Sequence, residues 1–305
     1  MKLLYIFLAS ISLTLPASTI IYSSSYIDVI NLAEIKNSSI VVDGNKITAI
    51  KKGFIQLSKD DILIDLRGMT LMPGFMDMHV HFGQEYVSKA ERPAKVERET
   101  SAIMATSHAL KTLKAGFTTV RQVGDSGMVA ISLRDTINSG KIIGPRIFTS
   151  GKSIATTGGH ADHTNGLSSD SYTYPTAEDG VINGPYEAYT AVRQRYKDGA
   201  DGIKLTVTGG VLSVAKSGDN PQFTIEEVDS IVKAAKDYGM WVAVHAHGAE
   251  GMKRAVLAGV DSVEHGTFMT EEVMDLMIQN GTYYVPTISA GEFVAEKSKI
   301  DNYFP

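Results

Sequence analysis

The sequence contains no cysteine and carries no excess of positive charge. The absence of cysteine excludes disulfide bonds and thiolate metal sites, so any metal must be held by nitrogen and oxygen ligands. A formal net charge of −5 and a pI near 5.9 give no sign of a nucleic-acid-binding surface. With 305 residues, 43% hydrophobic and 21% charged, the chain is long enough for one large globular domain and a small one.

The N-terminal stretch MKLLYIFLASISLTLPAS lacks the length of a membrane span. Lys2 precedes an apolar run that Ser and Thr dilute and Pro16 breaks. A span needs ~20 apolar residues, and small residues follow this shorter run. The layout is typical of a secretory signal peptide over residues 1–18, with an uncleaved N-terminal anchor as the alternative. We therefore expect a secreted or periplasmic protein with no stable membrane association after cleavage.

Residues 19–72 are predicted to form short strands of a small β layer, apart from the main core. The segments IDVINL, SIVVDGNKITAI and DILIDLRGMTLM alternate apolar and polar residues, as half-buried strands do. Asp43-Gly44 is a hairpin signal, and Arg67-Gly68 is a turn signal.

From Pro73 onward the pattern changes to alternating strands and helices. Helical periodicity with capping signals predicts helices over residues 100–115, 185–197, 224–238 and 270–279. The apolar strands between them read FMDMHVH, TTVRQVG, RIFTSGKSI, GIKLTVTG, WVAVHAHG, SVEHGTF and YYVPTIS. So many βα units predict an α/β protein with a TIM-like (β/α)8 barrel over residues 73–305, of which we count seven strands.

Residues 153–185 follow the third barrel strand and are rich in Gly, Ser, Thr, Asp and Tyr. The composition predicts a long loop between a strand and a helix. Loops of this kind build the active site at the C-terminal face of a barrel, so we expect this segment to line it and to set specificity.

Histidines fall at the ends of three predicted strands. His79 and His81 share one face of the first strand, because strand side chains alternate, and His245 and His247 repeat this arrangement. His265 ends a third strand. One His-x-His pair alone would more often be structural, but strand ends of a barrel converge on one mouth. The sequence therefore predicts a metal site, with imidazole ligands that suit zinc, manganese or iron.

Lys204 lies in an apolar strand, between Ile203 and Leu205, and is predicted to face the barrel interior together with Thr206. A bare buried ammonium is costly, and burial lowers its pKa. A neutral amine can take up CO2 and become a carbamate, an anion able to bridge two metal ions. The alternative is a lysine that pairs with an acid or extends to solvent.

Other polar residues are weaker candidates. His160, in TTGGHADH, either donates a hydrogen bond to a substrate carbonyl or carboxylate or stabilises its loop. Glu264 either supports the neighbouring His265 or faces outward. Asp77 is expected to pack inside the barrel, and His108 lies in a predicted helix and is expected to be structural.

The chain resembles the amidohydrolase superfamily from about Ile27 to its end. The resemblance rests on segments that occur in order at similar spacing: DLRGMTLMPGFMDMHVHFG, LKAGFTTVRQVGD, TGGHAD, GADGIKLTVTGG, VAVHAHG, AGVDSVEHGTFM and VPTIS. TGGHAD and VAVHAHG favour the imidazolonepropionase-like branch that includes Xaa-Pro dipeptidases. The resemblance implies a TIM-like barrel beside a small β-sandwich domain, of which residues 19–72 would be the N-terminal part.

The resemblance also implies roles for seven residues. His79 and His81 would bind one divalent metal ion, His245 and His265 a second, and Lys204, carboxylated by CO2, would bridge them. Zinc is expected, with manganese or iron as alternatives. His160 and His247 would be catalytic residues that contact the substrate, and a metal-bridging hydroxide would attack an amide bond.

The family ends its eighth barrel strand with a metal-binding Asp that no segment of this sequence supplies. We therefore expect a C-terminally truncated chain, either a fragment or a natural truncation. The expected function is cleavage of amide C–N bonds, most specifically by an Xaa-Pro-type dipeptidase acting on a dipeptide or other small molecule. The alternatives are hydrolysis of a cyclic amide, lactone or phosphotriester, and a non-catalytic metal-binding fragment. A homo-oligomer is left open.

Overall fold

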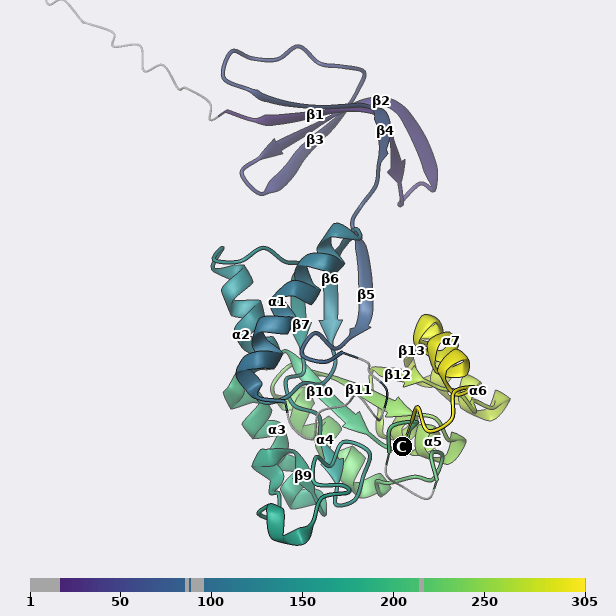
Figure 1. The fold of residues 1–305 in the computed structure, drawn as a ribbon. Helices are drawn as coiled ribbons and strands as arrows, with labels where there is room; N and C mark the ends of the chain where they lie inside the picture. Colours follow the sequence, from purple (N-terminus) through teal and green to yellow (C-terminus); the bar gives the residue numbers. More distant parts are fainter. Residues whose placement is uncertain (1–16, 86–87, 89–95, 214–216, 305) are drawn as a thin grey trace, which may run out of the picture. The chain divides into compact units, whose positions relative to one another are not determined.

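The computed structural model describes residues 17–85, 88, 96–213 and 217–304. The chain forms two compact units that divide between Gly74 and Phe75 (Figure 1). Residues 1–16, which carry most of the predicted signal peptide, lie outside the described residues. Among the residues that the structure does describe, no helix combines the length and apolar composition that a membrane span requires.

The first unit contains one four-stranded sheet, ordered β3-β2-β1-β4. Its strands are β1 (Thr19–Asp28), β2 (Ala33–Asp43), β3 (Lys46–Lys52) and β4 (Ile62–Leu71). β1 pairs antiparallel with β2 and parallel with β4. The hairpin prediction at Asp43-Gly44 is confirmed, because Asp43 pairs with Lys46 and Gly44 has a φ of 62°.

Two details of the predicted β layer are wrong. Residues 29–32 form a turn, and the first strand begins earlier, at Thr19. Arg67-Gly68 is not a turn between strands but lies inside β4. There the register with β1 shifts between Ser23 and Ser25, and Gly68 has a φ of 110°. A glycine that permits such a bulge gives the same local signal as a glycine in a turn.

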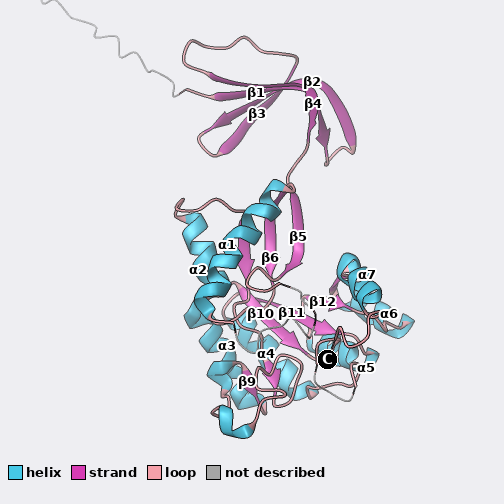
Figure 2. Ribbon diagram, in the orientation of Figure 1, coloured by secondary structure: helices cyan, strands magenta, loops and turns pink. Residues whose placement is uncertain are grey.

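The second unit alternates parallel strands and helices (Figure 2). Its main strands are β5 (Phe75–Val80), β6 (Phe117–Gln122), β7 (Arg146–Thr149), β10 (Gly202–Thr206), β11 (Trp241–Ala246), β12 (Ser262–His265) and β13 (Tyr283–Val285). The helices that follow them in turn are α1 (Arg98–Lys114), α2 (Val129–Asn138), α3 (Pro185–Asp198), α4 (Ile225–Asp237), α5 (Ala249–Ala258), α6 (Glu271–Asn280) and α7 (Ile288–Lys297). This is the TIM-like order that the sequence predicts.

The barrel strands pair in two runs, β5-β6-β7 and β10-β11-β12-β13. Ile154, in the segment after β7, forms an isolated parallel bridge with Leu205 of β10, and Ile154 N donates to Lys204 O at 2.8 Å. Among the described residues, no strand pairing joins β13 back to β5. The carboxyl ends of β5, β11 and β12 nevertheless meet, because the rings of His79, His245 and His265 at these ends lie close together.

Apolar side chains of the helices pack on the strands in two clusters. Ala105 of α1 and Leu133 of α2 pack with Val120 of β6. Val228 of α4 and Met252 of α5 belong to the larger cluster around β10, β11 and β12. This burial supplies the main driving force for the fold and holds the strand ends rigidly.

The helices predicted over residues 185–197 and 224–238 appear as α3 and α4, each within about a residue of the expected bounds. Thr224 forms the expected N-cap of α4, since its Oγ1 accepts a hydrogen bond from Glu227 N at 3.3 Å. The segment predicted as a loop over residues 153–185 also contains two paired short strands, β8 (Ala155–Thr156) and β9 (Val181–Ile182).

Candidate functional site

Six of the eight histidines gather at the carboxyl ends of the barrel strands. The ring centroid of His265 lies 4.8 Å from that of His79 and 4.6 Å from that of His245. His160, from the long loop, stacks on His245 at 4.2 Å, and His247 stacks on His265 at 5.2 Å. The structure thus brings together every histidine that the sequence singled out for the site, although up to 186 residues separate them in the chain.

His79 and His81 direct the same ring nitrogen toward each other. His79 Nδ1 lies 2.8 Å from the Glu264 carboxylate, and His81 Nδ1 lies 2.9 Å from Gly124 O. A carboxylate and a carbonyl can only accept, so each Nδ1 carries the proton and each Nε2 carries a lone pair. The two Nε2 atoms lie 3.2 Å apart, where their lone pairs repel unless a cation stands between them.

That separation fits a shared metal ion. Two nitrogens bound to one tetrahedral zinc ion at ~2.0–2.1 Å lie roughly 3.3–3.4 Å apart, close to the observed spacing of the two Nε2 atoms. His79 and His81 therefore meet the donor chemistry of the predicted first metal position.

His245 and His265 are also held with one free ring nitrogen. His245 Nε2 donates to Gly209 O at 3.0 Å, which leaves the lone pair on Nδ1. His265 Nδ1 lies 2.8 Å from Thr287 Oγ1. Both His265 and Thr287 have left-handed backbones, with φ of 73° and 48°. Such strained non-glycine residues cluster at functional sites, where the surrounding structure enforces them.

Lys204, on β10, is only 3% exposed. Burial lowers its pKa to about 8, although the charge of Glu264 opposes this. Glu264 and Arg121 act on it through charge alone, without a hydrogen bond from Nζ to a described residue. A buried amine without such a partner is reactive toward CO2, so Lys204 fits the predicted carbamate.

Burial is the main cause that lowers the histidine pKa values throughout the cluster. The pKa values of His79 and His245 lie well below 6.5, and that of His160 is about 4. The charge of Lys204 adds to the lowering in these three histidines, and also in His81 and His265. The neutral imidazole is the form that binds metal ions. Because the charge of Lys204 lowers the pKa values of five histidines, Lys204 lies within electrostatic range of five rings.

His160 and His247 lie at the edge of the cluster. His160 Nδ1 lies 2.6 Å from Ser213 Oγ, and His160 N donates to Gln222 Oε1 at 2.9 Å. His247 Nδ1 lies 2.7 Å from Thr267 Oγ1. Both rings are half-buried, so they are placed to contact a ligand that enters the cluster.

Within the described residues, no three histidine or carboxylate side chains are arranged to hold one metal ion as they stand. The predicted ligand set is not such a group of histidines and carboxylates, because it includes Lys204, which both metal ions would share. Lys204 can bind metal only after it becomes a carbamate.

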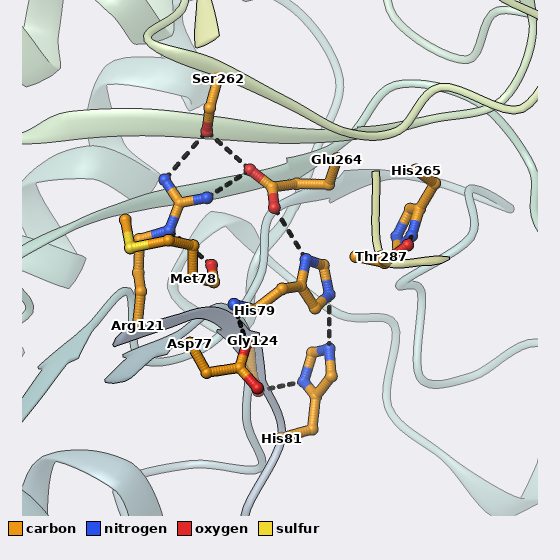
Figure 3. A network of polar contacts seen from close by, with 10 residues as sticks. All are labelled: Asp77, Met78, His79, His81, Arg121, Gly124, Ser262, Glu264, His265 and Thr287. Carbon is orange, nitrogen blue, oxygen red and sulfur yellow. Dashed lines mark hydrogen bonds and ion pairs between the residues drawn. The ribbon is translucent and has the colours of Figure 1, made fainter. Parts of the chain in front are cut away.

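Sequence reasoning missed several partners of these rings. Arg121 makes an ion pair with Glu264, and the carbonyl of Gly124 accepts from His81 (Figure 3). The carbonyl of Gly209 accepts from His245. Arg121 is the one charged residue of β6, and that is the signal the sequence offers. The carbonyl partners have no sequence signal, because every residue carries a carbonyl.

The Amidohydrolase family model matches residues 70–303. The chain is 32% identical to the ochratoxinase of Aspergillus niger over 235 residues, which are 73% of this chain and 48% of that protein. The chain thus spans about half the length of the curated relatives that it matches.

Among solved structures, the chain is similar to a Xaa-Pro dipeptidase with methionine bound in the active site. The two are 73% identical with a TM-score of 0.91, over 95% of this chain and 71% of that one. A prolidase in complex with N-methylphosphonate-L-proline is 29% identical with a TM-score of 0.82, over 95% and 70% of the two chains. The structure of Aspergillus niger ochratoxinase gives a TM-score of 0.78 at 27% identity, over 94% and 69%.

Proposed function

The chain belongs to the amidohydrolase family, and we propose that it is a metal-dependent hydrolase of amide C–N bonds, with Xaa-Pro-type dipeptides as its substrates. The observation that carries the proposal is the convergence of free ring nitrogens around a buried lysine. His79 and His81 direct two lone pairs at one point, and Lys204 lies close enough to influence both rings.

We propose that the centre holds two divalent metal ions, zinc in the first place, with manganese or iron as alternatives; the spacing of the His79 and His81 Nε2 atoms supports one of the two positions. His79 and His81 would hold one ion through Nε2, and His245 and His265 the other. Lys204, as a carbamate formed from its neutral amine and CO2 with release of a proton, would bridge the two. When bound, such ions supply a hydroxide nucleophile near neutral pH and polarise the scissile carbonyl.

The protein's own groups would hold and orient the substrate. His160 and His247 have half-buried rings beside the proposed ligands, so they are placed to hydrogen-bond a substrate carbonyl or carboxylate. Ser213 contacts His160, and Thr267 contacts His247, which limits rotation of both rings. Orientation of this kind lowers the barrier by placing the scissile bond in the attacking geometry.

The dipeptide assignment is supported by similarity. The Xaa-Pro dipeptidase structure shares 73% of its aligned residues with this chain, far above the 32% of the ochratoxinase match. Ochratoxin is the second candidate substrate because of that match. Cyclic amides, lactones and phosphotriesters are alternative substrates for the same metal-dependent hydrolysis. The alternative to an enzyme is a protein that binds metal without catalysis. We further propose export through residues 1–18, as expected from the sequence.

A substrate panel tests the proposal. The purified chain, loaded with zinc or manganese, would be assayed against Xaa-Pro and Xaa-Arg dipeptides, ochratoxin, a lactone and a phosphotriester, before and after chelation. We expect dipeptide cleavage that chelation removes and metal restores. Cleavage of the other substrates alone would overturn the dipeptide assignment, and cleavage unaffected by chelation would overturn metal dependence. Binding of metal with no cleavage at all would leave the non-catalytic alternative.

A further inference from the structure

A closed polar network lies on the Nδ1 side of the His79 ring, opposite the Nε2 that faces His81 (Figure 3). Glu264 is fully buried, with 0% exposure, on β12. Its Oε2 lies 2.8 Å from His79 Nδ1, while its Oε1 accepts from Arg121 Nη2 at 2.5 Å and from Ser262 Oγ at 2.6 Å. The carboxylate thus uses one oxygen for the ring and the other for the two donors.

Arg121 completes the network from β6. Its Nη1 donates to Ser262 Oγ at 2.9 Å, and its Nε donates to Met78 O at 2.8 Å. Its guanidinium also lies over the ring of Trp241, 5.3 Å from the centroid. One cation therefore holds both the carboxylate that contacts the His79 ring and the backbone carbonyl just before His79.

We propose that Glu264 is a positioning residue that fixes the tautomer of His79, and that Arg121 keeps it in that role. The inference rests on the proposed function, in which His79 binds metal through Nε2. Oε1 of Glu264 is already taken by the donors of Arg121 and Ser262, and Oε2 offers the His79 ring a carboxylate acceptor. His79 must then carry its proton on Nδ1, so the lone pair of Nε2 always faces His81.

The His79 partner differs in kind from those of the other rings. His81 and His245 donate to neutral carbonyls, and His265 contacts the hydroxyl of Thr287. Within the described residues, His79 is the histidine of this cluster whose ring contacts a carboxylate. A carboxylate makes the ring a more basic ligand and holds its orientation more firmly than a neutral acceptor does. The first metal position is therefore expected to depend on Glu264 more than the second does.

The isosteric Glu264→Gln variant tests this directly. Arg121 has only donors, so it keeps the amide oxygen on its own side and leaves the amide NH2 facing His79 Nδ1. His79 Nδ1 must then accept, and its proton moves to Nε2, where it blocks metal binding. We expect the variant to reverse the tautomer of His79 and to weaken metal binding at one of the two positions by roughly 10–100-fold.

The tautomer is read by 15N NMR of histidine-labelled, metal-free protein, with the His79 signals assigned by their loss in His79→Gln. Wild-type protein should show the Nδ1-protonated form and Glu264→Gln the Nε2-protonated form. Glu227→Gln is the matched control, because Glu227 is also buried but caps α4 and contacts Gly184 N. That control should leave the His79 signals unchanged.

The outcomes separate this inference from the proposed function. An Nε2-protonated His79 in the wild type would overturn the inference, even if Glu264→Gln failed to fold. The same tautomer in the wild type and in a folded Glu264→Gln would overturn it too. The expected tautomers in a chain that binds no zinc or manganese would support the positioning role and instead contradict the metal-dependent function.

Discussion

Replacing Lys204 with methionine is expected to stabilise the metal-free protein while it abolishes metal-dependent hydrolysis. Methionine matches the length of the lysine stem and carries no charge, in a position that is 3% exposed. Burial lowers the pKa of Lys204 from 10.5 to about 8, so the folded state binds the proton less tightly than the unfolded state. When Lys204 is charged, this pKa difference lowers the free energy of unfolding by roughly 3 kcal/mol.

The pH window follows from the same two values. Between pH 8 and 10.5 the unfolded chain binds more protons than the folded one, so the stability of the wild type should rise with pH in that window. Below pH 8 Lys204 is charged in both states, so it lowers the free energy of unfolding by the full amount and adds no further pH dependence. Lys204→Met should therefore be more stable than the wild type at pH 7 by roughly 3 kcal/mol, and the difference should shrink toward pH 10.

Urea unfolding provides the assay, with the fluorescence of Trp241, the single tryptophan, as the signal. The buffers must be free of metal and CO2, because both would alter Lys204. Lys152→Met is the matched control: burial also lowers the pKa of Lys152, but its Nζ lies 3.7 Å from Asp179, so its removal should give no gain. Equal stability of Lys204→Met and the wild type at pH 7 would refute the buried, unpaired ammonium.

Three further changes test separate parts of the site. His247→Ala should keep the metal content, measured by mass spectrometry, while turnover falls, since its ring contacts substrate in our proposal; loss of about one metal per chain would make it a ligand instead. Gly202→Ala should destabilise the protein by about 1–3 kcal/mol in thermal unfolding, because a Cβ there would lie 2.1 Å from the Trp241 ring; an unchanged midpoint would contradict that packing. Thr287→Val removes the partner of His265 Nδ1 and should weaken metal binding in a zinc titration by roughly 10-fold or more; an unchanged affinity would show that the contact does not orient the ring.

Much of the barrel could be predicted because its local signals agree with its packing. Thr224 and Thr270 cap α4 and α6 with their side chains, and both helices begin where the sequence indicates. Helices α2, α5 and α7 were not predicted, and in none of them does the side chain of the N-cap residue accept a hydrogen bond from the first turn. Without that signal, a short helix of 10 residues is hard to separate from a loop.

The candidate site could also be predicted only in part. His79, His81 and His265 could be predicted because histidines at strand ends of a barrel must converge. Their supporting contacts could not, because they depend on tertiary packing. Glu264 lies 185 residues from His79 and 143 from Arg121, and no local pattern selects that pairing from the alternatives.

Metal stoichiometry of the purified chain tests the central claim most directly. Mass spectrometry of protein reconstituted with zinc and bicarbonate should find two metal ions per wild-type chain. Lys204→Met, which lacks the proposed bridge, should retain fewer than two after the same treatment. A wild type that binds no metal, or a Lys204→Met variant that still binds two ions as tightly, would contradict a centre built on His79, His81, His245, His265 and a carboxylated Lys204.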